Sequence, residues 1–179
     1  MQSFTCWMSA HRVGLRNTLL GLGVLGGLTA CLDLPVQGTV AGEQMGYVFS
    51  SWYVDAGVVP VSPPDAQGLS QVVLSDYVVG CADIERAAGP APDAHSIAIS
   101  FMPVEGALTP GTYRVEALEN QNRAAATFVF GRGARVVQQV ALEGEIELLN
   151  TDGDLVEGIF SLGFMDGTLD GFFSSGRCP

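Results

Sequence analysis

The sequence predicts an all-β protein, either a single antiparallel β-sandwich or a small β-barrel, with a C-terminal meander. Three observations lead to this fold class. Helical periodicity is hard to find after residue 31, short runs rich in Val, Ile, Phe, Tyr and Thr recur, and Gly, Pro, Asp and Asn separate these runs. We expect strands near residues 37–41, 46–54, 70–79, 96–102, 112–118, 125–130, 135–142, 145–150, 155–164 and 168–174.

Two proline-containing segments interrupt the first half of the chain. They are VVPVSPPDAQG (58–68) and GPAPDAHS (89–96), and both are expected to be loops because proline cannot serve a central strand. The stretch ADIERAAG (82–89) is expected to form one helical turn. The sequence indicates no second domain.

The C-terminal third has the clearest strand pattern. In the run 155–164, LVEGIFSLGF, every second residue from Val156 to Phe164 falls on one face, as in a half-buried strand. Gly158 and Gly171 leave room for a neighbouring aromatic ring, with Phe160 and Phe173 as candidates, or mark a bend in a barrel.

Tight turns separate these strands. The dipeptide Asp-Gly occurs at 152–153 and at 166–167, and it suits hairpins because Gly accepts a positive φ. We therefore expect residues 144–174 to form a three-stranded antiparallel meander.

An apolar run without charges covers residues 18–30 near the start of the chain. It is shorter than the roughly 20 residues of a membrane-spanning helix. His11, Arg12 and Arg16 precede it, which is typical of an export signal. Translation from Met1 or from Met8 gives the same mature protein.

The run ends in Leu28-Thr29-Ala30-Cys31, which resembles the lipobox of bacterial lipoproteins. The resemblance implies cleavage between Ala30 and Cys31, a diacylglycerol on the Cys31 sulfur and an acyl chain such as palmitate on the new N-terminus. An ordinary secretory signal with a chance cysteine, or an uncleaved anchor, is the alternative. The chain as a whole also resembles small β-rich lipoproteins of bacterial envelopes, a likeness that implies no activity.

This resemblance implies three regions. Residues 1–30 are the signal peptide, residues 31–44 are the lipidated N-terminus with a short tether, and residues 45–179 are the β-domain. Leu32 follows the lipidated cysteine, and by analogy with lipoprotein sorting in enteric bacteria this implies the outer membrane, on its periplasmic or its surface face.

The mature chain is strongly acidic. Without Arg12 and Arg16 it has six basic residues, all arginine, against 19 acidic ones, a net charge of −13. Such a charge argues against nucleic acid and against anionic lipid as partners. The lipid anchor on Cys31 is therefore the expected membrane contact.

The cysteines predict one disulfide. Cys6 is lost with the signal and Cys31 carries lipid, so Cys81 and Cys178 remain. Outside the cytoplasm such thiols usually pair. A metal site is the alternative, but two cysteines and His95, the one histidine of the mature chain, form a poor ligand set.

The segment MGYVFSSWYVD (45–55) is the candidate binding site. If it is one strand, Tyr47, Phe49 and Tyr53 share one face and Trp52 lies on the other. One aromatic face could line a groove for a sugar or an apolar ligand. A central strand between two packed layers would explain the same pattern.

No catalytic constellation, metal site or cofactor is expected. The chain has no G-x-S-x-G elbow, and His95 is expected to be a solvated residue of a proline-flanked loop. A calcium loop from Asn150 fails because its sixth and twelfth positions are Leu155 and Ser161. Turn solvation explains these acidic residues better.

We therefore expect a non-enzymatic, lipid-anchored envelope protein whose β-domain binds a glycan, a peptide or an envelope protein, or has a structural role. Two alternatives remain. One is a cell-wall or polysaccharide hydrolase with two carboxylates roughly 5–10 Å apart in a cleft. The other is a barrel that carries an apolar ligand.

Overall fold

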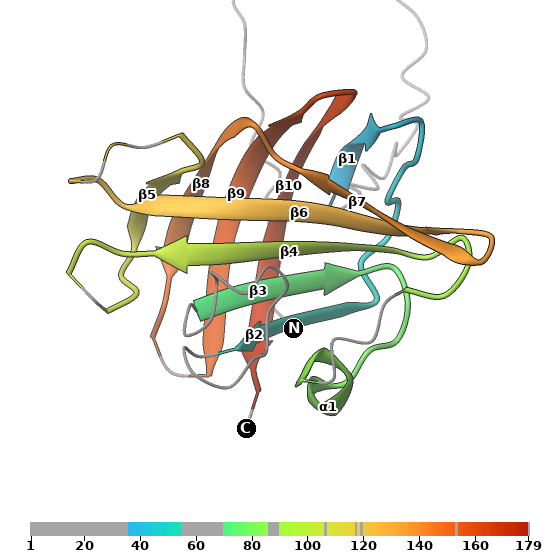
Figure 1. Cartoon of the computed structure of the whole chain (residues 1–179). Helices are drawn as coiled ribbons and strands as arrows, with labels where there is room; N and C mark the ends of the chain where they lie inside the picture. Colours follow the sequence, from blue (N-terminus) through green and yellow to red (C-terminus); the bar gives the residue numbers. More distant parts are fainter. Residues whose placement is uncertain are drawn as a thin grey trace, which may run out of the picture. The chain divides into compact units, whose positions relative to one another are not determined.

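The computed structural model describes residues 36–54, 70–85, 90–105, 107–116, 118, 120–152 and 154–178. These residues form ten strands and one short helix, so the all-β fold class is confirmed (Figure 1). In chain order the elements are β1 (Val36–Val40), β2 (Ser50–Val54), β3 (Ser70–Ser75), α1 (Cys81–Glu85), β4 (His95–Met102), β5 (Gly111–Arg114), β6 (Arg123–Arg132), β7 (Arg135–Val140), β8 (Glu143–Asn150), β9 (Leu155–Phe164) and β10 (Gly167–Arg177).

Eight of the strands close into a small barrel, which decides between the two expected architectures. Around the ring the order is β10, β2, β3, β4, β6, β5, β8 and β9, and β9 pairs with β10 again. β1 joins the other edge of β10, and β7 pairs with β6, so these two strands are additions to the ring. Closure removes most of the exposed edges that an open sheet would have.

Two junctions of the ring are parallel and short. β10 meets β2 through two residue pairs, Gly176 with Trp52 and Arg177 with Tyr53. β5 meets β6 through one pair, Arg114 with Arg123. Long antiparallel ladders make the rest of the ring, so these two junctions are where the barrel has the fewest backbone hydrogen bonds.

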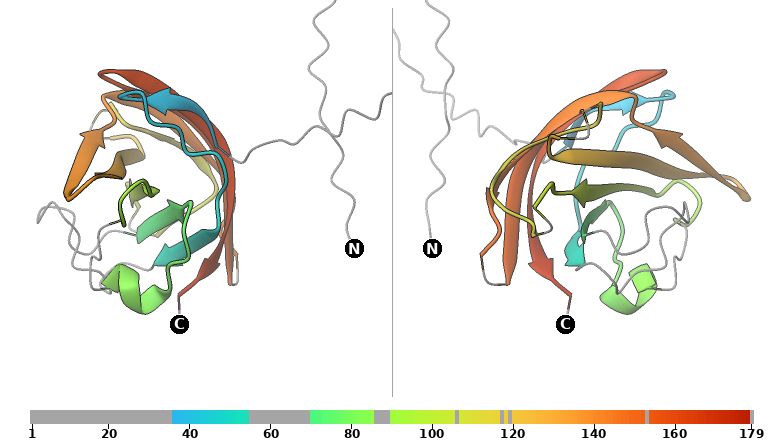
Figure 2. Two further views of the ribbon diagram at one scale, coloured as in Figure 1. Left: turned by 90° about the vertical axis from the view of Figure 1, so that its right-hand side faces the viewer. Right: turned by 60° about the vertical axis from the view of Figure 1, so that its left-hand side comes forward.

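The predicted meander is confirmed. β8, β9 and β10 are consecutive antiparallel neighbours, and they curve together as one wall of the barrel (Figure 2). Alternate residues of β9 are buried, as the pattern in 155–164 predicts. The hairpin at 166–167 forms, with Phe164 paired to Gly167, whereas the turn at 152–153 includes a residue outside the described part.

Four expected strands, 46–54, 70–79, 112–118 and 135–142, are shorter than predicted, and the β-domain begins before the expected boundary at residue 45. Residues 44–49 lie outside any strand, and β3 ends at Ser75. The expected tether, 31–44, contains β1, which pairs with β10 and buries Val36 and Val40 completely. The folded unit therefore begins before residue 45.

The barrel interior holds the main hydrophobic core. Its largest fully buried side chains include Tyr113, Phe101, Phe128 and Phe130, which come from three different strands. Phe101 and Tyr113 meet edge to face with ring centroids 5.2 Å apart. The interior-facing side chains of a small barrel fill its centre in this way.

A second, smaller cluster lies on the other side of β2. Val54, Val79 and Ile84 are buried in it, and Trp52 packs against them together with Cys178. This cluster includes α1, which begins at Cys81 and corresponds to the expected helical turn; residues 86–89 and the proline-rich segment 58–68 lie outside the described residues.

Glycine allows close approach at one predicted point. A Cβ atom on Gly158 would lie 2.7 Å from Cζ of Phe173 and 2.7 Å from the Glu147 carbonyl oxygen. Gly158 and Phe173 are direct cross-strand partners. The expected pairing of an interior glycine with an aromatic ring is therefore confirmed for Gly158.

Candidate functional site

Tyr47, Phe49 and Tyr53 do not form the shared strand face expected of the predicted binding segment. Tyr47 and Phe49 precede β2 and are 54% and 71% exposed, whereas Tyr53 is in the main core and Trp52 packs in the smaller cluster. The Trp52 indole Nε1 donates a hydrogen bond to the Val79 carbonyl oxygen at 2.7 Å, and the Tyr53 hydroxyl donates to Ser70 Oγ at 3.1 Å. Trp52 and Tyr53 are therefore packing residues, which matches the central-strand interpretation.

The predicted disulfide between Cys81 and Cys178 is present. The two Cα atoms are 5.7 Å apart, and 97 positions of sequence separate them. The bond joins the first residue of α1 to the residue after β10, next to the short parallel junction between β10 and β2. It therefore holds the C-terminal end of the chain against the cluster around Trp52.

The prediction for His95 is wrong. His95 is the first residue of β4 and is only 8% exposed, so it is not a solvated loop residue. Its ring stacks on Phe128, with centroids 5.7 Å apart and planes 8° from parallel. This burial makes the polar partners of the imidazole important, because a buried polar group without them is costly.

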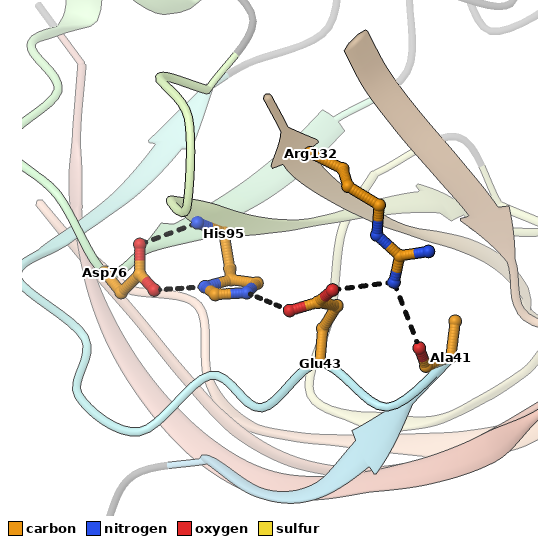
Figure 3. Close-up of polar contacts among 5 residues, drawn as sticks. All are labelled: Ala41, Glu43, Asp76, His95 and Arg132. Carbon is orange, nitrogen blue, oxygen red and sulfur yellow. Dashed lines mark hydrogen bonds and ion pairs between the residues drawn. The ribbon is translucent and has the colours of Figure 1, made fainter. Parts of the chain in front are cut away.

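Asp76 holds His95 at two points. Its Oδ1 accepts a hydrogen bond from the His95 backbone N–H at 2.7 Å, and its Oδ2 lies 2.5 Å from the ring Nδ1 (Figure 3). The Asp76 N–H donates in turn to the His95 carbonyl oxygen at 3.1 Å. Asp76 follows β3, the neighbour of β4, so its carboxylate fixes both the start of β4 and the orientation of the imidazole.

Glu43 lies on the other side of the imidazole. Its Oε2 is 3.6 Å from Nε2 of His95, a buried nitrogen that has no hydrogen-bond partner. Glu43 is placed by a tight turn after β1, in which Val40 and Glu43 exchange two backbone hydrogen bonds. Both central residues, Ala41 and Gly42, have positive φ angles, of 53° and 80°, as a type I′ turn requires.

Arg132 completes the group. At the end of β6, it donates a hydrogen bond to Glu43 Oε1 at 2.7 Å and another to the Ala41 carbonyl oxygen at 3.3 Å. The hydrogen bond from Arg132 lowers the pKa of the Glu43 carboxyl below its usual value; desolvation opposes this shift and His95 adds to it. We call Glu43, Asp76, His95 and Arg132 the His95 network.

The His95 network connects four parts of the fold at one end of the strands. Carboxylates and cationic or ionisable nitrogens alternate along it, from Asp76 through His95 and Glu43 to Arg132 (Figure 3). An imidazole fixed by a carboxylate is typical of acid–base catalysts. Here the second ring nitrogen also faces a carboxylate, so acidic side chains lie beside both ring nitrogens of His95.

The acidic residues of β8 form a row on the outer wall. Glu143, Glu145 and Glu147 alternate with buried or half-buried residues, so their side chains are roughly 7 Å apart along the strand. Glu145 pairs with Arg114 at 3.0 Å, and Glu145 and Glu147 border a shallow hollow of about 170 Å³. This spacing suits two hydrolytic carboxylates, but the row stands on an open wall.

The acidic turn after β8 has local partners. Asn150 Oδ1 accepts a hydrogen bond from the Asp152 N–H at 3.0 Å, and Asn150 Nδ2 lies 3.5 Å from Glu157. Within the described part of the chain, no group of three or more His, Cys, Asp or Glu residues could hold a metal ion. These hydrogen bonds of Asn150 are local to this turn and to the start of β9.

The predicted lipidation and cleavage sites, Ala30 and Cys31, lie outside the described residues. Among the described residues, no helix is long and apolar enough to cross a membrane. Comparison with known proteins finds no match to a protein-family model, to a curated protein or to a solved structure.

Proposed function

We propose that this chain is a lipid-anchored protein of the bacterial cell envelope whose β-barrel acts by binding or as a structural part. The Cys81–Cys178 disulfide carries the proposal. Such bonds persist in oxidising compartments and are rare in the cytosol. A disulfide across 97 positions agrees with an exported chain, and export is what the apolar run and the lipobox-like residues before Cys31 would direct.

The position of β1 limits how far the barrel can stand from the membrane. If Cys31 carries the lipid, only residues 32–35 lie between it and Val36, the first residue of β1, so the two are five residue steps apart. At no more than about 3.6 Å per residue, this distance is at most about 18 Å. The expected tether to residue 45 would have allowed about 50 Å. The barrel is therefore held close to the bilayer surface by its β1 side.

The site geometry supports binding or a structural role over catalysis. The His95 network directs its histidine at a carboxylate, and the carboxylate row of β8 stands on an open wall. A glycoside hydrolase needs its two carboxylates on either side of the scissile bond. Aromatic side chains also occupy much of the barrel interior, which leaves the apolar-carrier alternative without a specific supporting feature.

Membrane fractionation tests this proposal. Cells that express the wild-type chain should hold it in the membrane fraction, with an acylated Cys31 at the N-terminus by mass spectrometry. Cys31→Ser should move the protein to the soluble fraction, and Cys6→Ser is the matched control that should change nothing. An unmodified Cys31 thiol, or unchanged membrane retention of Cys31→Ser, would refute the anchor.

A further inference from the structure

β7 is an edge strand of the sheet. Among the described strands it pairs with β6 alone, and the β6–β7 hairpin extends past the end of β3 at the side of the barrel (Figure 1). Its side chains are half-buried at most, and Val136 and Val140 are 51% and 58% exposed. Its second edge therefore has backbone groups available for another strand.

The register of the hairpin identifies these groups. Arg132 pairs with Arg135 across a two-residue loop, and the Ala141 N–H donates to the Ala126 carbonyl oxygen at 2.8 Å. Bonded and non-bonded pairs alternate along an antiparallel ladder. Residues 135, 137, 139 and 141 therefore bond to β6, and residues 136, 138 and 140 direct their N–H and C=O groups away from it.

Apart from Arg135 at its first position, β7 has none of the features that usually protect an edge strand against pairing. Natural edge strands carry lysine, proline, a bulge or an inward-facing charge. Residues 136–142 (VVQQVAL) contain no charge and no proline, although the chain has 19 acidic residues. An exposed edge of this kind is a template for an added strand.

We propose that β7 is the contact surface for a second copy of this chain. Two β7 strands would pair antiparallel about a two-fold axis at Gln138, with Gln138 opposite Gln138 and Val136 opposite Val140 of the second copy. In this register residues 136, 138 and 140, whose backbone groups point away from β6, all form hydrogen-bonded pairs with the second copy. The two half-exposed valines become cross-strand neighbours, an arrangement that stabilises sheets.

Charge favours this register. The one charged residue of β7, Arg135, falls opposite Ala141 of the second copy, so no like charges face each other along the strand. Glu143 of the second copy begins β8 two residues after Ala141, so the first charged residue that follows this end of the strand has the opposite sign. The pairing therefore avoids the repulsion that the net charge of the chain would cause on other surfaces.

The small contact area predicts weak association. A strand of six residues buries less than the roughly 1,200 Å² of a stable interface. Confinement of both copies to one membrane would raise their effective concentration, and this step rests on the proposed anchor. We therefore expect the dimer in the membrane, and little of it in dilute solution.

Disulfide trapping tests the register. Gln138→Cys in the full chain, oxidised in isolated membranes, should give a cross-linked homodimer, because Cα atoms of a bonded pair are about 5.5 Å apart, within disulfide range. Gln37→Cys on β1, the other added strand, is the matched control and should cross-link at least several-fold less. Equal cross-linking at both positions, or capture of another protein at position 138, would overturn the proposal.

A second variant removes one backbone donor at the two-fold axis. Gln138→Pro deletes an N–H that faces away from β6, so the barrel should keep its unfolding midpoint, whereas chemical cross-linking of the dimer in membranes should fall strongly. Gln138→Thr keeps this N–H and should retain the dimer. An undiminished dimer in Gln138→Pro would overturn the proposal.

Fractionation of Gln138→Cys with and without Cys31→Ser separates the two proposals. Membrane-bound protein without the cross-link refutes the dimer alone, and retention of the double variant in membranes refutes the anchor alone.

Discussion

Removal of the Cys81–Cys178 disulfide should destabilise the barrel strongly. The bond closes a loop across 97 positions. On the chain-entropy model, a loop of about 100 residues contributes about 4.7 kcal/mol, and measured losses for native disulfides are about 2–5 kcal/mol. With an unfolding entropy of about 2.1 cal/mol/K per residue over roughly 150 residues, this predicts a fall in Tm of about 6–15 °C.

The location of the bond predicts where the effect concentrates. Cys178 follows the short parallel junction of β10 with β2, and Cys178 N–H donates to the Tyr53 carbonyl oxygen at 2.8 Å. Without the crosslink, the end of β10 keeps its pairing with β9, whereas α1 loses its covalent connection to the C-terminus, so α1 and the cluster around Trp52 should open before the rest. Backbone amides of β8 and β9 should keep their protection until global unfolding.

Thermal and urea unfolding followed by circular dichroism provide the assay, with hydrogen exchange for the local effect. The Cys81→Ala/Cys178→Ala double variant is compared with the reduced wild-type protein, and the two should coincide if the crosslink itself is responsible. A Tm within 2 °C of the oxidised wild type would refute the entropic argument, since it corresponds to well under 1 kcal/mol at about 0.3 kcal/mol/K.

Three further changes have defined outcomes. Ala41→Gly should raise stability to urea by about 0.5–1 kcal/mol, because Ala41 has a φ of 53° that glycine adopts without a Cβ clash; a lower urea midpoint would contradict this. Arg132 lowers the pKa of Glu43 in the folded state, so the stabilisation from this ion pair is present above the unfolded pKa and is lost as the pH falls through the folded pKa. The unfolding midpoint of Glu43→Gln should therefore differ from that of the wild type at neutral pH and converge with it in acid. A difference that stays constant with pH would refute the ion pair. Gly158→Ala should lower the free energy of unfolding in urea by about 1–3 kcal/mol, because its Cβ would lie 2.7 Å from a backbone oxygen of β8. Gly46→Ala is the control and should be neutral, since a Cβ there meets no atom within 4 Å. Equal effects of the two substitutions would show that the close approach is unimportant.

Much of the strand arrangement could be predicted because alternation is a local property. In β9, each buried residue is followed by one on the outer wall, so the pattern of 155–164 identifies the strand and its inner face. The same argument failed for residues 46–49, where aromatic and β-branched residues resemble a strand. Tyr47 and Phe49 are exposed there because no neighbouring strand pairs with this stretch over its length.

The His95 network could not be predicted. Its members come from a turn after β1, the end of β3, the start of β4 and the end of β6, and no spacing in the sequence connects them. His95 follows a proline-rich segment, so local composition indicates a solvated loop. Its burial depends on Phe128 of β6 and on Asp76, which the pairing of β3 and β4 brings beside it.

The sequence by itself determined the fold class, the meander 144–174, the pairing of Cys81 with Cys178 and the expectation of a lipidated Cys31. These follow from alternation, from hairpin dipeptides and from counting the available thiols, which need no knowledge of distant contacts. Only the tertiary structure decided that the strands close into a barrel, that β1 belongs to the folded unit, that His95 is buried between two carboxylates and that β7 keeps a free edge. Each of these depends on which strands become neighbours, and that is settled when the whole chain buries its apolar faces together.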